Sequence, residues 1–271
     1  MLSLAYAAEA LAARAGGKAL YTRRLRRDRL TVARVDVPID GLPAALDGFT
    51  IAHMSDFHAG PFLDAGSLTD VVDVVREHRP DVIALTGDYI THRADEAFPL
   101  AAALARVESR HGGVLVFGNH DYHARREGEI AAAFAAVGIE ALRNEGRALE
   151  VDGARLWLAG VEDVEEGKVV DLDAALADRS DEDVTVLLSH HPDMVEHLDG
   201  RDVDLVLAGH THGGQIVVGG RSPLGSLRSR YLSGLHSVGD TRLFVTRGLG
   251  VLIVPLRIGA PPEVAILTLR A

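Results

Sequence analysis

Two histidines stand one residue apart in the glycine-rich stretch LAGHTHGG, at residues 207–214. In an extended or tightly turned backbone, side chains two positions apart point the same way, so His210 and His212 can face one point in space. The flanking glycines let the backbone come close to whatever occupies that point. Because neutral imidazole is the commonest metal ligand, the pair indicates a metal ion or an anion; two polar residues of an ordinary turn are the alternative.

Residues of the same kinds follow four other apolar segments. Each of the segments FTIAHMS, DVIALTG, GGVLVFG and VTVLLSH contains or precedes at least one of Asp56, His58, Asp88, Asn119, His120, Asp121, His190 and His191. Taken singly, each group is more typical of a turn or helix cap than of a ligand. Their joint occurrence, with no Lys or Arg at these segment ends, indicates a shared metal site.

A site of this kind needs elements that bring distant residues together. Short runs rich in Val, Ile and Leu predict strands at residues 49–55, 81–87, 112–118, 155–161, 184–190, 203–209, 242–248 and 263–269. Apolar residues at three- and four-residue spacing predict helices at 66–78, 97–110 and 125–137. This alternation predicts an α/β layered fold, with an antiparallel hairpin that turns at Asp152 and Gly153. Sites in such sheets gather at the carboxyl ends of strands, so the polar groups can converge.

Composition limits the chemistry. The chain has 271 residues, 47% of them hydrophobic, and its net charge of -11 argues against nucleic-acid binding, which needs a basic footprint. The absence of cysteine excludes thiolate sites, so ligands must come from imidazole, carboxylate and amide groups. A mixed nitrogen and oxygen set favours two divalent transition-metal ions, Mn, Fe or Zn, over Ca or Mg.

The first forty residues differ from the rest, so we expect an N-terminal basic, amphipathic segment at 1–40 and a single domain at 41–271. An apolar stretch at 1–13 is followed by RRLRRDR at 23–29. Positive charges precede the apolar core in a secretory signal, and no apolar run reaches the roughly 20 residues of a spanning helix. We therefore expect neither a signal nor a span. The segment either rests on an anionic membrane surface or packs on the domain, which predicts a cytoplasmic protein, peripheral at most to the inner membrane.

Five blocks of sequence, SDFHAG, TGDYI, FGNHDYH, LLSHHPD and LAGHTHGGQI, resemble in this order the motifs of the calcineurin-like metallophosphoesterases. The resemblance covers about residues 48–270, and the five-block set is highly specific. It implies a four-layer α-β-β-α sandwich of two mixed sheets flanked by helices. The GHTHGGQ ending and the tail RGLGVLIVPLRIGAPPEVAILTL are most similar to the bacterial membrane-associated branch, some of whose members act on lipid-linked sugar nucleotides.

The resemblance also implies a ligand set. One metal would be held by Asp56, His58 and His212, a second by Asn119, His190 and His210, and both by Asp88. A carboxylate can span two cations about 3.5–4 Å apart and leave room for a shared hydroxide. Because adjacent side chains are expected to point apart, His191 is then a substrate-side or packing residue.

The implied reaction is hydrolysis of a phosphomonoester, phosphodiester or diphosphate bond by the metal-bridging hydroxide. His120 is expected to face the substrate and to protonate the leaving oxygen or bind the phosphoryl group. Asp121 either orients that imidazole or caps a helix or turn. Arg228 and Arg230 either grip a phosphate or are solvated loop charges.

The branch resemblance, the basic cluster and the apolar GVLIVPL favour a lipid-linked or nucleotide-diphosphate substrate such as UDP-2,3-diacylglucosamine. The expected partners are therefore a phosphate-ester small molecule or a lipid-linked substrate, with peripheral membrane contact and no nucleic acid. The alternative is a non-catalytic metal-binding scaffold of the same fold. A scaffold would be expected to lack ligands or the acid histidine, and every one of those positions carries a competent residue here.

Overall fold

The computed structural model describes residues 4–167, 169–219, 221–222 and 229–271. Its helices are α1 (Leu4–Ala12), α2 (Lys18–Thr22), α3 (Thr69–His78), α4 (Ala97–Leu104), α5 (Asn119–His123), α6 (Glu127–Ala135) and α7 (Leu172–Ala175). Its strands are β1 (Thr31–Pro38), β2 (Thr50–Met54), β3 (Val82–Thr86), β4 (Gly113–Val116), β5 (Ile139–Ala141), β6 (Glu145–Val151), β7 (Ala154–Gly160), β8 (Val184–Leu188), β9 (Leu205–Ala208), β10 (Gly234–Val238), β11 (Thr241–Val245) and β12 (Glu263–Arg270). All eight predicted strands and the three predicted helices have a counterpart here, shifted by a few residues at their ends.

The first sheet has the strand order β1-β12-β2-β3-β4-β5. Strands β2 to β5 are parallel, whereas β12 is antiparallel to β2 and parallel to β1. Met54 of β2 pairs with Leu85 of β3, which in turn pairs with Leu115 of β4. The carboxyl ends of these three strands therefore lie at one edge of the sheet.

The second sheet has the order β10-β11-β9-β8-β7-β6. Its four central strands are parallel, and an antiparallel hairpin closes each side, β6 with β7 and β10 with β11. The β6–β7 hairpin turns at Asp152 and Gly153, as predicted. Valine and leucine dominate these strands because a parallel strand is buried on both faces.

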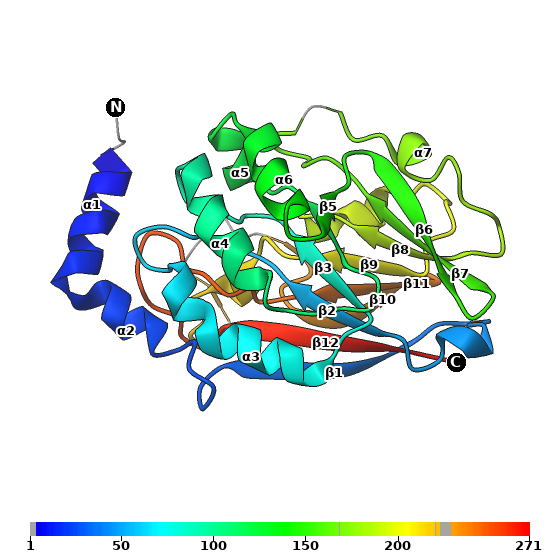
Figure 1. Ribbon diagram of the computed structural model, residues 1–271, viewed down its shortest axis with the longest axis horizontal. Helices are drawn as coiled ribbons and strands as arrows, with labels where there is room; N and C mark the ends of the chain where they lie inside the picture. The colour runs from blue at the N-terminus through cyan, green and yellow to red at the C-terminus, as the bar shows by residue number, and fades with distance from the viewer. Residues whose placement is uncertain (1–3, 168, 220, 223–228) are drawn as a thin grey trace.

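The two sheets and their helices form four layers (Figure 1). Val114, Val186 and Leu207 belong to the apolar core between the sheets. Helices α3, α4 and α6 cover the outer face of the first sheet, while α7 and a 3-10 helix at Pro192–His197 pack on the second. This is the α-β-β-α sandwich of two mixed sheets that the resemblance implied.

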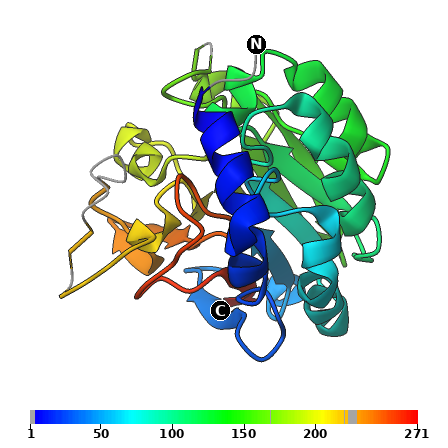
Figure 2. The same ribbon diagram turned by 90° about the vertical axis from the view of Figure 1, so that its left-hand side faces the viewer.

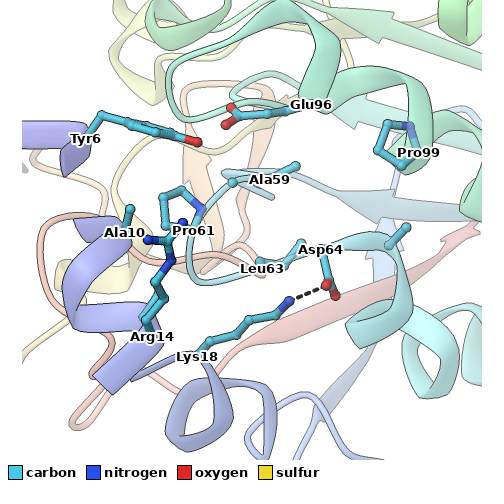
Figure 3. Close-up of a pocket in the computed structure, with 13 residues that line it drawn as sticks. Tyr6, Ala10, Arg14, Lys18, Ala59, Pro61, Leu63, Asp64, Glu96 and Pro99 are labelled. Carbon is cyan, nitrogen blue, oxygen red and sulfur yellow. Dashed lines mark hydrogen bonds and ion pairs between the residues drawn. The ribbon is translucent and has the colours of Figure 1, made fainter. Parts of the chain in front are cut away.

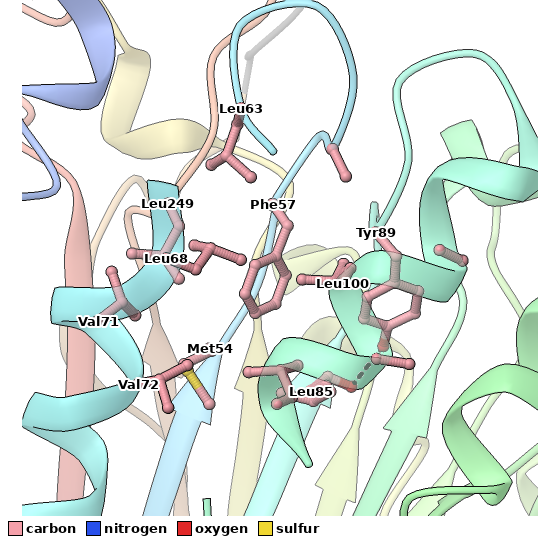
Figure 4. Packing of buried hydrophobic residues seen from close by; sticks show 14 of the residues in the cluster. Met54, Phe57, Leu63, Leu68, Val71, Val72, Leu85, Tyr89, Leu100 and Leu249 are labelled. Atoms are coloured by element: carbon pink, nitrogen blue, oxygen red, sulfur yellow. Dashed lines mark hydrogen bonds between the residues drawn. The ribbon is translucent and has the colours of Figure 1, made fainter. Parts of the chain in front are cut away.

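Helix α3 shows how the predicted spacing becomes packing. Leu68, Val71, Val72 and Val75 are all at most 1% exposed, because residues three and four apart share one helix face. Figure 4 shows Val72 beside Met54 of β2, and Val71 belongs to the same apolar core. Burying a side chain of this size stabilises the fold by about 1.5–3 kcal/mol.

Strand β1 places the domain boundary earlier than the predicted residue 40. Each of its residues pairs with β12, and Ala33, Val35 and Val37 belong to the core between the sheets. The alternation of these residues with charged neighbours was a strand signal, but the arginine-rich run directly before it concealed the change. The sheet therefore begins at Thr31, and the N-terminal segment is about ten residues shorter than expected.

The N-terminal segment packs on the domain. Helix α1 leads through a wider helical turn at Ala13–Gly17, kinked at Gly16 with φ 105°, into α2. Tyr21 and Leu25 are fully buried in the core outside the first sheet. The packed arrangement is thus one of the two that the sequence predicted. Among the described residues, no helix has the length and apolar character that crossing a bilayer requires.

Candidate metal centre

The predicted ligands leave both sheets at their carboxyl ends. The segments after β2, β3 and β4 of the first sheet and after β8 and β9 of the second carry Asp56, His58, Asp88, Asn119, His190, His210 and His212. All of these except Asn119 belong to three-residue groups, two of which also include His120 or His191, whose ligand atoms lie within 4.8 Å of one another. The site therefore spans the junction between the two sheets.

Buried aromatic rings fix the two aspartate segments. Phe57 lies between Asp56 and His58, and its side chain is fully buried among the residues outside the first sheet (Figure 4). Tyr89, directly after Asp88, is also fully buried, and its hydroxyl donates to the carbonyl oxygen of Val116 at 2.7 Å. With the aromatic side chains anchored in the core, their neighbours are directed to the opposite side, toward the site.

Five of the seven predicted ligands adopt a left-handed backbone. The φ angle is 50° at Asp56, 46° at His58, 55° at Asp88, 68° at His210 and 52° at His212. This conformation is uncommon for residues other than glycine and costs of order 1–3 kcal/mol each. Such residues gather at functional sites, where the surrounding structure holds them and their exact direction matters.

Asp56, His58 and His212 form the first predicted ligand group. Nε2 of His58 lies 3.0 Å from Nε2 of His212, which lies 3.4 Å from Oδ1 of Asp56. All three side chains are at most 2% exposed. Three ligand atoms thus converge at the buried end of β2 and β9.

The second group lies beside the first. Nδ1 of His210 is 3.2 Å from Nε2 of His190, and Oδ2 of Asp88 is 3.4 Å from Nε2 of both His190 and His58. Oδ1 of Asn119 is buried and has no hydrogen-bond partner among the described residues. A buried amide oxygen without a partner is costly, so its position is consistent with a ligand atom.

The donor set fits divalent cations. Burial lowers the pKa of His58 and of His212 well below the ordinary value, and that of His210 to about 3, so these imidazoles are neutral lone-pair donors. Burial also raises the pKa of Asp56 to about 6, a cost that a neighbouring cation would offset. Burial opposes ionisation of Asp88 too, yet the imidazole of His190 holds the pKa of that carboxyl well below its usual range.

Hydrogen bonds outside the ligand group orient it. Nδ1 of His190 donates to the carbonyl oxygen of Thr86 at 2.7 Å, which leaves Nε2 to face Asp88. The backbone N–H of His210 donates to Asp56 at 3.1 Å. A Cβ atom at Gly209 would collide with this same carboxylate, which accounts for the glycine in LAGHTHGG.

If Asp121 oriented the imidazole of His120, as one of its two predicted roles, the two side chains would be in contact. The hydrogen bonds of both side chains go to other partners. Nδ1 of His120 lies 3.1 Å from the carbonyl oxygen of Thr91. The buried Asp121 carboxylate accepts from the backbone N–H groups of Asp88 at 2.8 Å and Gly118 at 2.9 Å. Asp121 therefore has the capping arrangement, the second of its two predicted roles, while the His120 ring lies 4.8 Å from that of His58, centroid to centroid.

His191 does not point away from the site, contrary to the expectation for adjacent residues. The centroid of its ring lies 3.8 Å from that of the His210 ring, and its Nε2 lies 3.1 Å from Oδ2 of Asp163. The turn after β8 is tight enough to bring both histidines to one side. Asp163 is buried and was not predicted, although it follows β7 at the same sheet edge.

Arg257 is a second residue that sequence reasoning missed. Its buried guanidinium donates to the carbonyl oxygen of His212 at 3.0 Å and lies 3.3 Å from Nδ1 of that ring. It is the only charge in the apolar run at 249–262, and a lone charge inside such a run was a usable signal.

The predicted phosphate-gripping arginines are not part of this cluster. Arg230 pairs with Glu196 at 3.2 Å and is 77% exposed. It lines a separate pocket, of which none of the seven predicted ligands is a part. Arg228 lies outside the described residues. Arg230 therefore corresponds to the solvated loop charge that was the alternative prediction.

Comparison with known proteins shows the family of the chain. Residues 49–214 match the family described as calcineurin-like phosphoesterase. The chain belongs to this family of metallophosphoesterases, and with it to the metal-dependent phosphoric ester hydrolases.

Two bacterial relatives match over most of their length. The chain is 32% identical to the uncharacterized metallophosphoesterase YkuE of Bacillus subtilis, over 95% of this chain and 91% of that protein. It is 30% identical to the phosphodiesterase YaeI of Escherichia coli, over 82% of each. A transmembrane protein with metallophosphoesterase domain from Danio rerio is 31% identical over 88% of this chain, which spans 57% of that protein.

Proposed function

We propose that this chain is a dinuclear phosphoesterase that hydrolyses phosphomonoester, phosphodiester or diphosphate bonds with two ions of Mn, Fe or Zn. The observation that carries the proposal is the Asp88 carboxylate, whose Oδ2 lies 3.4 Å from Nε2 of both His58 and His190. An oxygen equidistant from two ligand groups is the arrangement that a bridged pair of cations requires. The name of the phosphodiesterase YaeI supports the same class of substrate.

When bound, such ions acidify a water molecule toward neutral pH and neutralise charge on the phosphoryl oxygens. The chain itself supplies the proton for the leaving group. The Thr91 carbonyl can only accept, so Nδ1 of His120 carries a proton and Nε2 is the atom able to exchange one with the leaving oxygen. His120 is half-buried, whereas its neighbours His58 and Asp88 are buried, and this position suits a group that meets the substrate.

We further propose a lipid-linked or nucleotide-diphosphate substrate, such as UDP-2,3-diacylglucosamine. The apolar loop at 251–258 and the basic N-terminal segment support a substrate that carries both acyl chains and phosphate. The location that suits it is the cytoplasm, in peripheral contact with the inner membrane surface.

The test compares three substrates with the Mn-loaded protein: p-nitrophenyl phosphate, bis-p-nitrophenyl phosphate and UDP-2,3-diacylglucosamine. Turnover should require metal and be lost in Asp88→Asn. Asp199→Asn is the matched control, because Asp199 shares the left-handed backbone of Asp88 but is an exposed residue remote from the ligand groups. Metal binding without turnover of any substrate would favour the scaffold alternative. Cleavage of the monoester alone would exclude the lipid-linked substrate.

A further inference from the structure

Most of the large exposed apolar side chains belong to two neighbouring segments. Within the described part of the chain, twelve large hydrophobic residues are exposed. Seven of them belong to two segments, the N-terminal helices and the loop 251–258. Leu4 is 91% exposed, Leu11 70% and Ile253 66%. We call this set the apolar face; it consists of Leu4, Leu11, Leu20, Ile253, Val254, Leu256 and Ile258. A cluster of exposed apolar residues marks an interaction site more often than scattered ones do.

The two segments of the apolar face adjoin each other. The ring of Pro255 packs against Gly17, so closely that a Cβ atom there would lie 3.0 Å from Cγ of the proline. The buried hydroxyl of Tyr21 donates to the carbonyl oxygen of Gly250 at 3.0 Å. Figures 1 and 2 both show the orange to red loop before β12 beside α1 and α2. The loop and the N-terminal helices are therefore in contact near Gly17.

Ile253 is held in a strained conformation. Its φ is 65°, and a β-branched residue with positive φ is a true outlier. The side chain is mostly exposed, so packing does not explain the choice of isoleucine. Backbone strain at an exposed apolar position points to a role in binding.

The N-terminal segment that carries part of the apolar face is rich in positive charge. The first 30 residues hold seven of the 28 Lys and Arg residues but only two of the 39 acidic ones, in a protein of net charge -11. Lys18 is bound to Asp64, whereas Arg14 lines a cavity of about 440 Å³ beside Pro61 (Figure 3). Arg14, Arg23 and Arg24 are exposed, and none of them forms an ion pair within the described part of the chain.

The apolar face is tied directly to the metal centre. Arg257, inside the loop 251–258, donates to the carbonyl oxygens of His212 at 3.0 Å and Gly250 at 2.8 Å. The Gln215 side chain, three residues after His212, exchanges two hydrogen bonds of 3.0 Å with the backbone of Leu252. A partner that binds the loop 251–258 is therefore held close to the metal-ligating side chains.

We propose that the apolar face docks on an anionic lipid bilayer. The loop 251–258 and α1 insert apolar side chains among the headgroups, and Arg14, Arg23 and Arg24 bind lipid phosphates. Charge complementarity selects this occupant, because an isolated basic cluster on an acidic protein is attracted to anionic lipid. Docking on the bilayer does not depend on the reaction. Only its consequence rests on the proposed function, namely that lipid-linked phosphate esters are delivered to the metal centre.

The test is sedimentation of the full chain with vesicles of phosphatidylcholine alone or with 30% phosphatidylglycerol. The wild-type protein should bind the anionic vesicles and be released as NaCl rises from about 50 to 500 mM, because salt screens surface charge. The double variant Ile253→Asp, Leu256→Asp and the variant Arg23→Glu, Arg24→Glu should each lower the partition coefficient about 10-fold or more. Val169→Asp, at an apolar position 72% exposed outside the face, should bind as the wild type does.

Three results would overturn the proposal. The first is the absence of wild-type binding to anionic vesicles, and the second is equal binding by all variants. The third is a wild-type dimer in light scattering that the Ile253→Asp, Leu256→Asp variant converts to monomer, since a second copy would then cover the face. Circular dichroism checks that the variants fold. Hydrolysis of bis-p-nitrophenyl phosphate in vesicle-free solution should be unchanged in them, so failure of docking and failure of the proposed activity give different results.

Discussion

His120 occupies the rim of the metal site, and its role is separable from metal binding. We predict that His120→Ala retains its metal but loses about 10²-fold or more in turnover, the usual contribution of a general acid. The ligand atoms of the seven predicted metal residues are untouched by the change. Metal analysis and steady-state kinetics on the same sample check this, and an unchanged rate with full metal content would reject the role.

His53 offers a residue-scale test of pH dependence. It is fully buried in β2, and burial lowers its pKa from 6.5 to about 3. Between these values the unfolded chain binds a proton that the folded chain does not, so stability falls as pH falls from about 6.5 toward 3. The slope is about 1.4 kcal/mol per pH unit. In chelated protein, His53→Gln should show a shallower decline of the free energy of unfolding below pH 6.5; parallel curves for the two proteins would contradict the assignment.

At the residue scale, the sequence was sufficient where each residue follows its own strand. Asp56, Asp88 and His210 could be located because an apolar run ends just before them and parallel strands share an edge. Asp163 and Arg257 were missed although each had a signal: Asp163 follows β7 at the same sheet edge, and Arg257 is the only charge in the apolar run at 249–262. Their contacts with His191 and His212 are made across loops, and no periodicity records such contacts. The direction of His191 was wrongly predicted for a related reason: a tight turn overrides the alternation of an extended strand.

Among the elements, α2 is held to the domain chiefly through one side chain. The Tyr21 hydroxyl donates to the carbonyl oxygens of Leu249 and Gly250 in the interior. We predict that Tyr21→Phe lowers the free energy of unfolding by about 1–3 kcal/mol, because the buried carbonyl oxygen of Leu249 loses its donor while that of Gly250 keeps Arg257. Trypsin should then cleave after Arg23 or Arg24 faster than in the wild type. Tyr6→Phe is the control, as Tyr6 lies in α1 away from these carbonyls; equal cleavage in both variants would contradict the anchor.

The strands and helices with strong periodicity were predicted, while weakly patterned ones were not. Strands β1, β5 and β10 were missed: β5 has only three residues, and β10 reads GLHSV, with alternating exposure and little apolar content. Both lie at sheet edges, where one side of the strand has no neighbour to bury it. Edge strands depend on pairing that a linear pattern does not contain, so their prediction requires the sheet order itself.

For the whole molecule, the metal centre is a link between two sheets. Four predicted ligands follow strands of the first sheet and three follow strands of the second, so bound ions would add a link between layers that meet through an apolar core and a few polar contacts. Ions that bind only the folded state add about 2.7 kcal/mol at 100 times their Kd. At about 2–4 °C per kcal/mol for a chain of this size class, we predict a rise in Tm of roughly 5–11 °C on loading chelated protein with Mn²⁺.

Calorimetry of chelated and Mn-loaded protein measures this link directly. The rise should shrink strongly in Asp88→Asn, which removes the carboxylate shared by both ligand groups, and persist in Asp199→Asn, the exposed control with the same backbone conformation. Because the ions would hold both sheets, the loaded protein should unfold in one transition. An equal rise in Tm in both variants would mean that Mn²⁺ stabilises the protein at another place. The predicted centre would then not link the two sheets.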